Sequence, residues 1–377
     1  MKEVYVKYAK LIVEQVVCVK PGENVLIEIT DVDDGLALEM MRAVHAVGGR
    51  AFYHQMRDTL QSAWISGADN EAIQMQAQWD VQRMREMDVY ISLRLNKNPY
   101  DMAEIPLERS KEYRTYYERP VHFQTRIPHT RWLATCEPNE AMAQSAGMAT
   151  ESFEKFYYEC CCIDYARFAQ RMQPLAERMK KADWVRIKGS DVDLSFRIRN
   201  KGVCVCRGTH NIPAGEVFTA PEIDSAEGYI CYNTPTFFDN EQFEGVRLEL
   251  RGGKIVSYSC RHGSQSHMDA IFATDEGARF IGEFAMGTNP FVDRVIGSIL
   301  FDEKAAGSFH FTPGNSYESC GNGNISNIHW DMVYRMQPEY GGGEIWFDDT
   351  LIQKNGIFLP QDLQPLNPEL LKKEIAL

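Results

Sequence analysis

The amino-terminal half of the chain alternates short apolar runs with longer segments of helical periodicity. Apolar residues recur at helical spacing over residues 4–16, and Pro21-Gly22 predicts the end of this helix. The next three segments are predicted to form a strand, a helix ended by two glycines and a second strand, over residues 25–29, 36–47 and 50–54. A strand, a helix and a strand in this order make a βαβ unit, which implies a parallel sheet.

Further segments extend this pattern. Strands are predicted over residues 89–93 and 131–135, and residues 70–87 carry no helix breaker, which is typical of a helix. The aromatic and charged stretch 113–119 is interpreted as a solvated connection. The amino-terminal half is therefore predicted to be a doubly wound α/β domain with a parallel sheet.

The pattern changes near residue 150. Residues 151–181 predict a long helical segment interrupted by Pro174, and period-two alternation begins at Trp184. This alternation predicts six strands, over residues 184–188, 193–199, 203–206, 229–233, 246–250 and 254–258. Gly252-Gly253 predicts a hairpin turn, and residues 268–284 predict one more helix. We expect two domains, an α/β domain over residues 1–150 and an α+β domain over residues 151–377.

Composition narrows the class of protein. A chain of 377 residues with 44% hydrophobic positions is long enough for two cores. Its net charge of −13 would repel a phosphate backbone, which argues against a nucleic-acid partner. No apolar run approaches the roughly 18 to 20 residues of a membrane span, so we expect a soluble, cytoplasmic protein with no membrane partner. The ten cysteines contain no CxxC pair, and we assign them no chemistry.

The sharpest chemical feature lies in residues 327–332, which alternate polar and apolar residues and predict a strand. His329 and Asp331 share one face of this strand, and Ile328, Trp330 and Met332 share the other. An imidazole and a carboxylate held side by side on a rigid element suit a divalent metal. Taken alone, the His329 and Asp331 pair fits a hydrogen-bonded surface pair better than a metal site, because His-x-Asp is common by chance.

Other residues favour the metal. His310 stands between two phenylalanines, and Glu283 is predicted at an apolar helix end. Glu216 lies in an almost uncharged segment. Burying either carboxylate without a partner would cost several kcal/mol unless it is neutralised or faces a cation. Together with His329 and Asp331, these residues predict one shared metal centre.

These segments resemble the thermophilic-type metallo-aminopeptidases, the family of aminopeptidase T, aminopeptidase S and PepS. The resemblance is carried in order by residues 211–221 (NIPAGEVFTAP), Glu283 with residues 287–290 (GTNP), Asp302-Glu303, His310, Tyr317 and residues 329–331 (HWD). It is clear over most of residues 184–335, and in the amino-terminal half it extends only to the general α/β pattern.

The resemblance implies a set of ligands for two divalent metal ions, namely Glu216, Glu283, Glu303, His310, His329 and Asp331. It also implies that Glu283 bridges the ions, that Tyr317 is a ligand or neighbour, and that the protein is a homodimer. Oxygen and imidazole ligands suit zinc, cobalt or manganese. Four carboxylates exceed the charge of one divalent ion, which independently favours two.

The sequence departs from the family pattern at two places. The run between Glu303 and His310 is longer than in many members, which makes Glu303 the least supported ligand. Residues 311–314 read Phe-Thr-Pro-Gly where an aliphatic-Ala-x-Gly turn is more usual, so an altered substrate preference is expected.

The function implied is that of an aminopeptidase that hydrolyses small peptides. Water between two divalent ions has its pKa lowered towards about 7, one ion would polarise the scissile carbonyl, and the other would take the free α-amine of the peptide. Tyr317 would donate to the developing oxyanion, and Glu283 is a hypothetical proton carrier.

Two alternatives stay open. His310, His329 and Asp331 form the ligand set of a mononuclear non-haem Fe(II) dioxygenase, an activity known on this peptidase-like fold. The third interpretation is a non-catalytic protein that binds a metal or a cationic ligand.

Overall fold

A computed structural model describes residues 3–95, 97–98, 101–102, 105–238 and 241–377. By its contacts the chain divides into two compact units. The amino-terminal unit comprises Met1–Cys162 with Gly208–Ile212, and the carboxyl-terminal unit comprises Ile163–Arg207 with Pro213–Leu377. The domain boundary predicted after residue 150 stays a prediction.

The amino-terminal unit is built on a four-stranded parallel sheet with strand order β2-β1-β3-β4. Its strands are β1 (Asn24–Thr30), β2 (Arg50–Met56), β3 (Val89–Arg94) and β4 (Arg131–Cys136). The predicted parallel sheet is confirmed. β1 and β3 are the two inner strands of this sheet, and their apolar runs are buried, as is typical of a parallel sheet with both faces covered.

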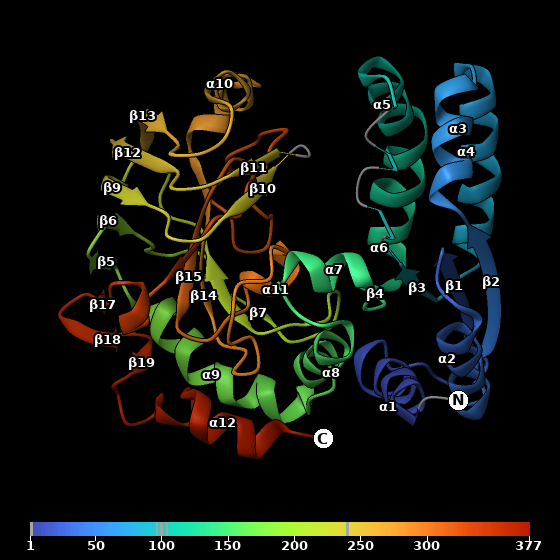
Figure 1. Cartoon of the computed structure of the whole chain (residues 1–377), viewed down its shortest axis with the longest axis horizontal. Coiled ribbons are helices and arrows are strands. Elements are labelled where there is room, and N and C mark those ends of the chain that lie inside the picture. The colour runs from blue at the N-terminus through green and yellow to red at the C-terminus, as the bar shows by residue number, and fades with distance from the viewer. Residues whose placement is uncertain (1–2, 96, 99–100, 103–104, 239–240) are drawn as a thin grey trace. The chain divides into compact units, whose positions relative to one another are not determined.

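Helices connect these strands (Figure 1). They are α1 (Glu3–Leu11) with a π-helical turn (Ile12–Val16), α2 (Asp34–Ala46), α3 (Asp58–Gly67), α4 (Asn70–Arg85), α6 (Ile127–His129), α7 (Glu140–Ser145) and α8 (Thr150–Cys161). The helices predicted over residues 4–16, 36–47 and 70–87 correspond to α1 with its extension, α2 and α4.

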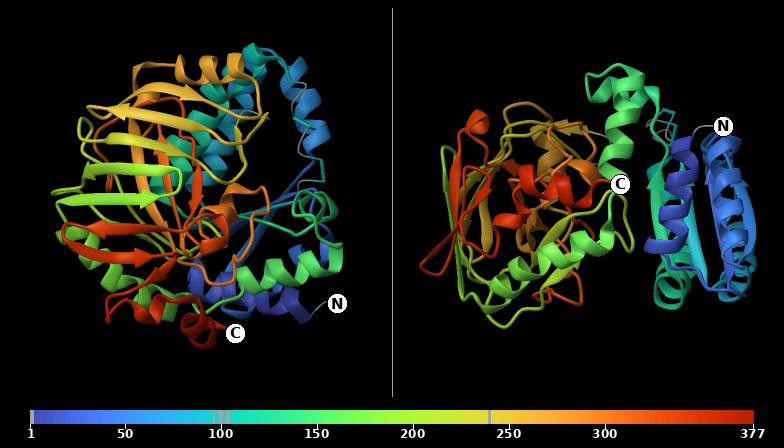
Figure 2. Two further views of the ribbon diagram at one scale, coloured as in Figure 1. Left: turned by 60° about the vertical axis from the view of Figure 1, so that its left-hand side comes forward. Right: turned by 90° about the horizontal axis from the view of Figure 1, so that it is seen from below.

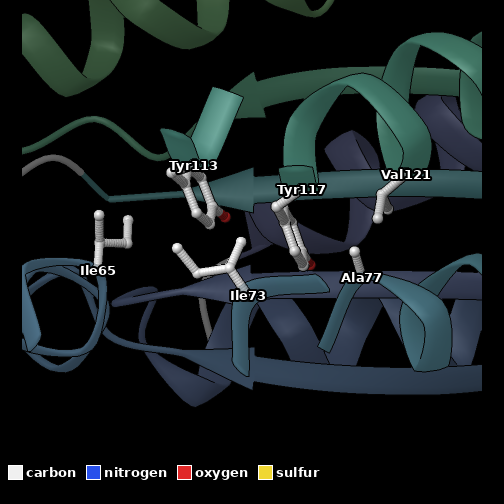
Figure 3. Close-up of a cluster of buried hydrophobic side chains, with 6 residues drawn as sticks. All are labelled: Ile65, Ile73, Ala77, Tyr113, Tyr117 and Val121. Atoms are coloured by element: carbon white, nitrogen blue, oxygen red, sulfur yellow. The ribbon is translucent and has the colours of Figure 1, made fainter. Parts of the chain in front are cut away.

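The interpretation of residues 113–119 as a solvated connection was wrong. Helix α5 (Leu107–Tyr113) continues into a π-helical segment (Arg114–Arg126). Tyr113 and Tyr117 stack with ring centroids 4.8 Å apart and pack on Ile65, Ile73 and Ala77 (Figure 3). Residues four apart share one helix face, so the two tyrosines point inward together, while Arg114 and Thr115 between them stay exposed.

The carboxyl-terminal unit begins with helix α9 (Tyr165–Lys181). The prediction that Pro174 interrupts the helical segment 151–181 was wrong, because α9 runs through Pro174 and the break lies at residues 162–164. Asp164 caps α9 by accepting a hydrogen bond from the N–H of Arg167, which fixes the start of this helix. Helix α12 (Pro368–Ile375) lies beside α9 (Figure 1).

An eight-stranded antiparallel sheet follows, with strand order β13-β12-β9-β6-β5-β17-β18-β19 (Figure 2, left). Its strands are β5 (Trp184–Gly189), β6 (Val192–Arg197), β9 (Glu227–Cys231), β12 (Arg247–Arg251), β13 (Lys254–Ser259), β17 (Gly343–Phe347), β18 (Thr350–Lys354) and β19 (Ile357–Phe358). The predicted hairpin at Gly252-Gly253 is confirmed. Both glycines have positive φ, and a Cβ on Gly253 would lie 1.8 Å from the carbonyl oxygen of Ile223.

A second antiparallel sheet has the order β16-β15-β14-β8-β7. Its strands are β7 (Cys204–Cys206), β8 (Glu216–Thr219), β14 (Ile281–Gly287), β15 (Ser308–Pro313) and β16 (Val333–Arg335). The remaining elements are the pair β10 (Thr236–Phe238) and β11 (Glu241–Phe243), helix α11 (Ile299–Asp302), and short 3₁₀ turns at Pro338–Tyr340 and Gln364–Leu366.

The helix predicted over residues 268–284 was wrong. Helix α10 (Gln265–Phe272) is short, a 3₁₀ turn follows (Glu276–Arg279), and the central strand β14 carries the rest. All seven residues of β14 are buried, so its apolar run has no period that distinguishes it from a buried helix. The fold class is as predicted, a parallel α/β part and an α+β part.

Candidate metal centre

Three neighbouring strands bring the first candidate residues together. Glu216 opens β8, Glu283 lies on the central strand β14, and His310 lies on β15. The Nε2 of His310 is 2.9 Å from Glu283 Oε1 and 3.6 Å from Glu216 Oε2. All three side chains are at most 7% exposed, so an imidazole and two carboxylates meet away from solvent.

His329 and Asp331 complete the cluster from an extended loop. The strand predicted over residues 327–332 was wrong as an element, because only His329 forms an isolated bridge there, to Gly314. The predicted division into two faces is confirmed: Ile328, Trp330 and Met332 are buried, and His329 Nε2 lies 3.2 Å from Asp331 Oδ1. The same Nε2 is 4.0 Å from Glu283 Oε2.

Two further contacts orient this pair. The hydroxyl of Thr312 donates a hydrogen bond to Asp331 Oδ1 over 2.6 Å. His329 donates its Nδ1–H to the carbonyl oxygen of Asn315 over 2.8 Å. These bonds leave Nε2 of His329 to face the carboxylates, which is how proteins commonly orient a metal-binding histidine.

Glu303 approaches the cluster from the turn after α11 and is accompanied by a lysine. The ammonium of Lys304 lies 2.5 Å from Glu216 Oε1 and also pairs with Glu303 Oε1. The side chain of Lys304 is 3% exposed. A buried cation therefore already contacts two of the predicted ligands.

Tyr317 lies at the edge of the cluster. Its ring centroid is 5.2 Å from that of His329 and 5.8 Å from that of Phe218, and the residue is 51% exposed. Burial of the hydroxyl, with Glu283 and Asp331 nearby, raises the pKa of Tyr317 above its ordinary value. The hydroxyl consequently stays protonated at neutral pH and can donate a hydrogen bond.

The two histidines are held in their protonated forms. Burial alone would lower the pKa of His310, but the hydrogen bond to Glu283 and the charge of Glu216 raise it to about 9. Burial would likewise lower the pKa of His329, and Asp331 raises it to about 10.

The carboxyl groups separate into two kinds. Burial raises the pKa of Glu303 to about 8, although Lys304 opposes the rise, and burial also raises the pKa of Glu283. For Asp331 the effect of burial is outweighed by His329 and His310, so its pKa lies well below the usual range. At neutral pH, protons therefore offset much of the negative charge of this cluster. Metal cations would offset the same charge when bound.

Two groups of side chains meet the geometric needs of a metal ion. One comprises Glu216, Glu303 and His310, the other comprises Glu283, His310 and Asp331, and the ligand atoms within each lie within 4.8 Å of one another. Both groups contain His310, so they form one continuous cluster. Among the described residues, Glu216 Oε2 and Glu283 Oε2 are buried without a hydrogen-bond partner. Such orphaned oxygens are costly, and they fit a cation.

Sequence reasoning missed three residues of this site, Lys304, Thr312 and Asn315. Thr312 lies two residues after His310, so period-two alternation places both side chains on one face of β15. Asn315 contributes only its backbone carbonyl, which leaves no signal in the sequence. Lys304 is the only lysine or arginine in residues 303–310, where mostly small and apolar residues follow it.

The family model described as thermophilic metalloprotease (M29) matches residues 1–358 of the chain. The chain belongs to this family. This match confirms the family resemblance that the motifs indicated. It also confirms the predicted enzyme class, which is a metallo-aminopeptidase. Aminopeptidase PepS of Streptococcus thermophilus is 22% identical over 385 residues, which cover 88% of this chain and 92% of that protein.

Two solved structures share the fold. Wild-type AmpT from Thermus thermophilus aligns with a TM-score of 0.77 at 17% identity, over 95% of this chain and 99% of AmpT. The 2,5-dihydroxypyridine dioxygenase of Pseudomonas putida KT2440 aligns with a TM-score of 0.62 at 14% identity, over 95% of this chain and 98% of that chain. At these identities both establish the fold and not the chemistry.

Within the described residues, no helix has the length and apolar character needed to cross a bilayer. The family is a family of metal-dependent peptidases, so a divalent metal cofactor and peptide substrates follow from membership.

Proposed function

We propose that this M29 protein removes amino-terminal residues from small peptides with the help of two divalent metal ions. The proposed ligands are Glu216, Glu283, Glu303, His310, His329 and Asp331. The observation that carries the proposal is the pair of metal-compatible groups joined at His310, each with a buried carboxylate oxygen that has no hydrogen-bond partner.

The charges of the cluster support two ions over one. Its four carboxylates carry four negative charges when ionised, and Lys304 offsets one of them. Three negative charges remain in a buried site, more than one divalent ion neutralises. Zinc, cobalt and manganese all suit this oxygen and imidazole donor set.

The chain's own residues have distinct roles in this proposal. When bound, the ions would supply a nucleophilic water with a pKa near about 7 and a Lewis acid for the scissile carbonyl. Glu283 lies between His310 and His329 and is the candidate proton carrier. Tyr317, protonated and half-exposed at the edge of the cluster, is the proposed hydrogen-bond donor to a developing oxyanion.

The test combines metal analysis with turnover. The metal-free protein is titrated with zinc, cobalt and manganese, ions per chain are counted, and release of free amino acid from a panel of dipeptides is followed. We expect two ions and metal-dependent hydrolysis. Glu216→Gln should bind fewer than two ions and lose hydrolysis, whereas Glu344→Gln, which alters a partly exposed surface ion pair, should keep two ions and full activity. Retained activity and metal stoichiometry in Glu216→Gln would contradict the ligand assignment.

The dioxygenase alternative has a specific observation in its favour, the shared fold of the Pseudomonas putida enzyme. His310, His329 and Asp331 would supply its two histidines and one carboxylate. It gives no account of Glu216, Glu303 and Lys304, which a mononuclear iron site does not require. One iron per chain with oxygen uptake on a hydroxypyridine, and no peptide hydrolysis, would favour it.

A non-catalytic binder predicts tight metal binding with no turnover in the same panel. The homodimer and the cytoplasmic location stay predictions. Sedimentation of the metal-loaded protein tests the first, because a dimer would have about twice the 43.1 kDa mass of the chain.

A further inference from the structure

Lys304 is a lysine with almost no access to solvent, next to the proposed ligands. Its side chain is 3% exposed, and its ammonium pairs with one carboxylate oxygen of Glu216 and one of Glu303. Lysine is almost never fully buried unless it is paired. The burial of Lys304 therefore has to be explained by the ion pairs that its ammonium group forms with Glu216 and Glu303.

The backbone around Lys304 is fixed to the segment that carries Glu216. The carbonyl of Lys304 accepts a hydrogen bond from the backbone N–H of Asn289 over 2.8 Å. The side-chain amide of Asn289 donates to the carbonyl of Ala214 over 2.9 Å, and the N–H of Thr288 donates to the carbonyl of Gly215 over 2.9 Å. The starting points of the Lys304 and Glu216 side chains are therefore held at a set separation.

The contact with Lys304 determines which carboxylate oxygen of Glu216 remains available to a metal ion. Lys304 holds Oε1, and Oε2 then faces His310 Nε2 at 3.6 Å, buried and without a hydrogen-bond partner. Without the ammonium, the Glu216 carboxylate could turn, and the ion pair that holds Glu303 beside it would be lost. The metal-compatible group of Glu216, Glu303 and His310 depends on both.

We propose that Lys304 is a positioning residue of the metal centre, which holds Glu216 and Glu303 so that their remaining oxygens and His310 bind the second metal ion. This inference rests on the proposed function, because it takes the dinuclear site as given. It also predicts an asymmetry. Within the described part of the chain, the Lys304 side chain forms no ion pair or hydrogen bond with Glu283, His310 or Asp331, so the ion held by that group should bind without Lys304.

The positive charge of Lys304 also has an effect that opposes metal binding. An ammonium beside a metal site repels the metal, so removal of Lys304 would tighten binding if repulsion outweighed positioning. Mutation of a group that orients a metal-binding side chain typically lowers metal affinity by about 10- to 100-fold. The two effects have opposite signs, and a titration separates them.

The experiment titrates metal-free Lys304→Met, Lys304→Gln and wild-type protein with zinc against a chromophoric chelator, after circular dichroism has verified folding. We expect wild type to bind two ions, and Lys304→Met to bind one unchanged and the other about 10- to 100-fold more weakly. Lys304→Gln, which keeps amide donors and loses the charge, should lie between them. Lys354→Met, which removes a half-exposed lysine, is the control and should match wild type.

Equal or tighter binding of the second ion in Lys304→Met would overturn the inference while leaving the proposed function intact. Binding of fewer than two ions by wild type would instead refute the dinuclear site itself. If neither variant folds, a crystal structure of zinc-loaded wild type decides: Lys304 should still contact Glu216 and Glu303, and a displaced ammonium would refute the role.

Discussion

His329 donates its Nδ1–H to the main-chain carbonyl of Asn315 over 2.8 Å, and this bond decides which ring nitrogen faces the cluster. The acceptor is a carbonyl oxygen, so Nδ1 must carry the hydrogen. The Nε2 is thereby turned towards Asp331 and Glu283. A backbone group that cannot be mutated away thus sets the tautomer of a proposed ligand.

Replacing His329 by alanine should abolish turnover with little effect on the fold. The side chain is 24% exposed and leaves no buried cavity, but its Nε2 is a proposed ligand. We expect kcat/KM for dipeptides to fall at least about 100-fold and zinc affinity to fall with it. Turnover assays and a chelator competition measure both, and a variant that binds zinc and turns over normally would remove His329 from the site.

Thr312→Val tests the orientation of Asp331. Thr312 is fully buried and donates its hydroxyl hydrogen to Asp331 Oδ1, and valine has nearly the same shape. Loss of this bond should weaken zinc binding about 10- to 100-fold.

The matched control is Thr219→Val in the same sheet. Thr219 is 1% exposed and donates to the carbonyl of Gly202. Both variants should lose a similar stability of about 1 to 3 kcal/mol, but only Thr312→Val should change the zinc affinity. Equal affinities in the two variants would count against a role for Thr312 at the metal.

Zinc affinity should rise with pH between about 6 and 9, because zinc must displace protons from the cluster. The pKa of Glu303 is raised to about 8, that of His310 to about 9 and that of His329 to about 10. At pH 7 these groups are largely protonated in the metal-free protein, so zinc binding releases protons. The dependence of the calorimetric binding enthalpy on the ionisation enthalpy of the buffer counts them, and an affinity independent of pH would contradict this prediction.

Much of the fold could be predicted from local patterns. Strands β1 and β3 of the parallel sheet were predictable because each contains an apolar run bounded by turns or helix ends, and Gly252-Gly253 marked a hairpin. Glu283 was placed on a helix because the central strand β14 is buried at every position, so its sequence shows no alternation with a period of two. Local pattern cannot distinguish these cases, since pairing partners far along the chain decide between them.

The site was predictable to the extent that its residues are unusual in their surroundings. Acids and histidines within apolar segments indicated Glu216, Glu283 and His310, and the spacing of His329 and Asp331 placed them on one face. Lys304 gave no such signal, because a lysine after a glutamate is ordinarily a solvated surface pair. Only the fold reveals that the hydrogen bonds of Asn289 bring its turn to Glu216.

Removal of metal should destabilise the protein, and the effect should grow with pH. In the metal-free protein the raised pKa of His310 contributes stability that is fully present below about pH 6.5 and is lost as pH rises through about 9. The raised pKa of Glu303 acts in the same direction, with its contribution lost as pH rises through about 8. Zinc binds the deprotonated cluster, so its stabilisation increases over the same range. Zinc at 100 times its Kd adds about 2.7 kcal/mol per site.

Thermal unfolding at pH 6.5, 8 and 9 with zinc or with excess chelator measures this difference. We expect the gap in Tm between the two samples to widen with pH, and to shrink in Glu216→Gln, which removes one proposed ligand. In Glu344→Gln the gap should equal that of wild type, because the exposed pair of Glu344 with Lys354 lies outside the cluster. A Tm that does not respond to chelator at any of these pH values would show that the buried carboxylates are stabilised without a metal, by their protons and Lys304 alone.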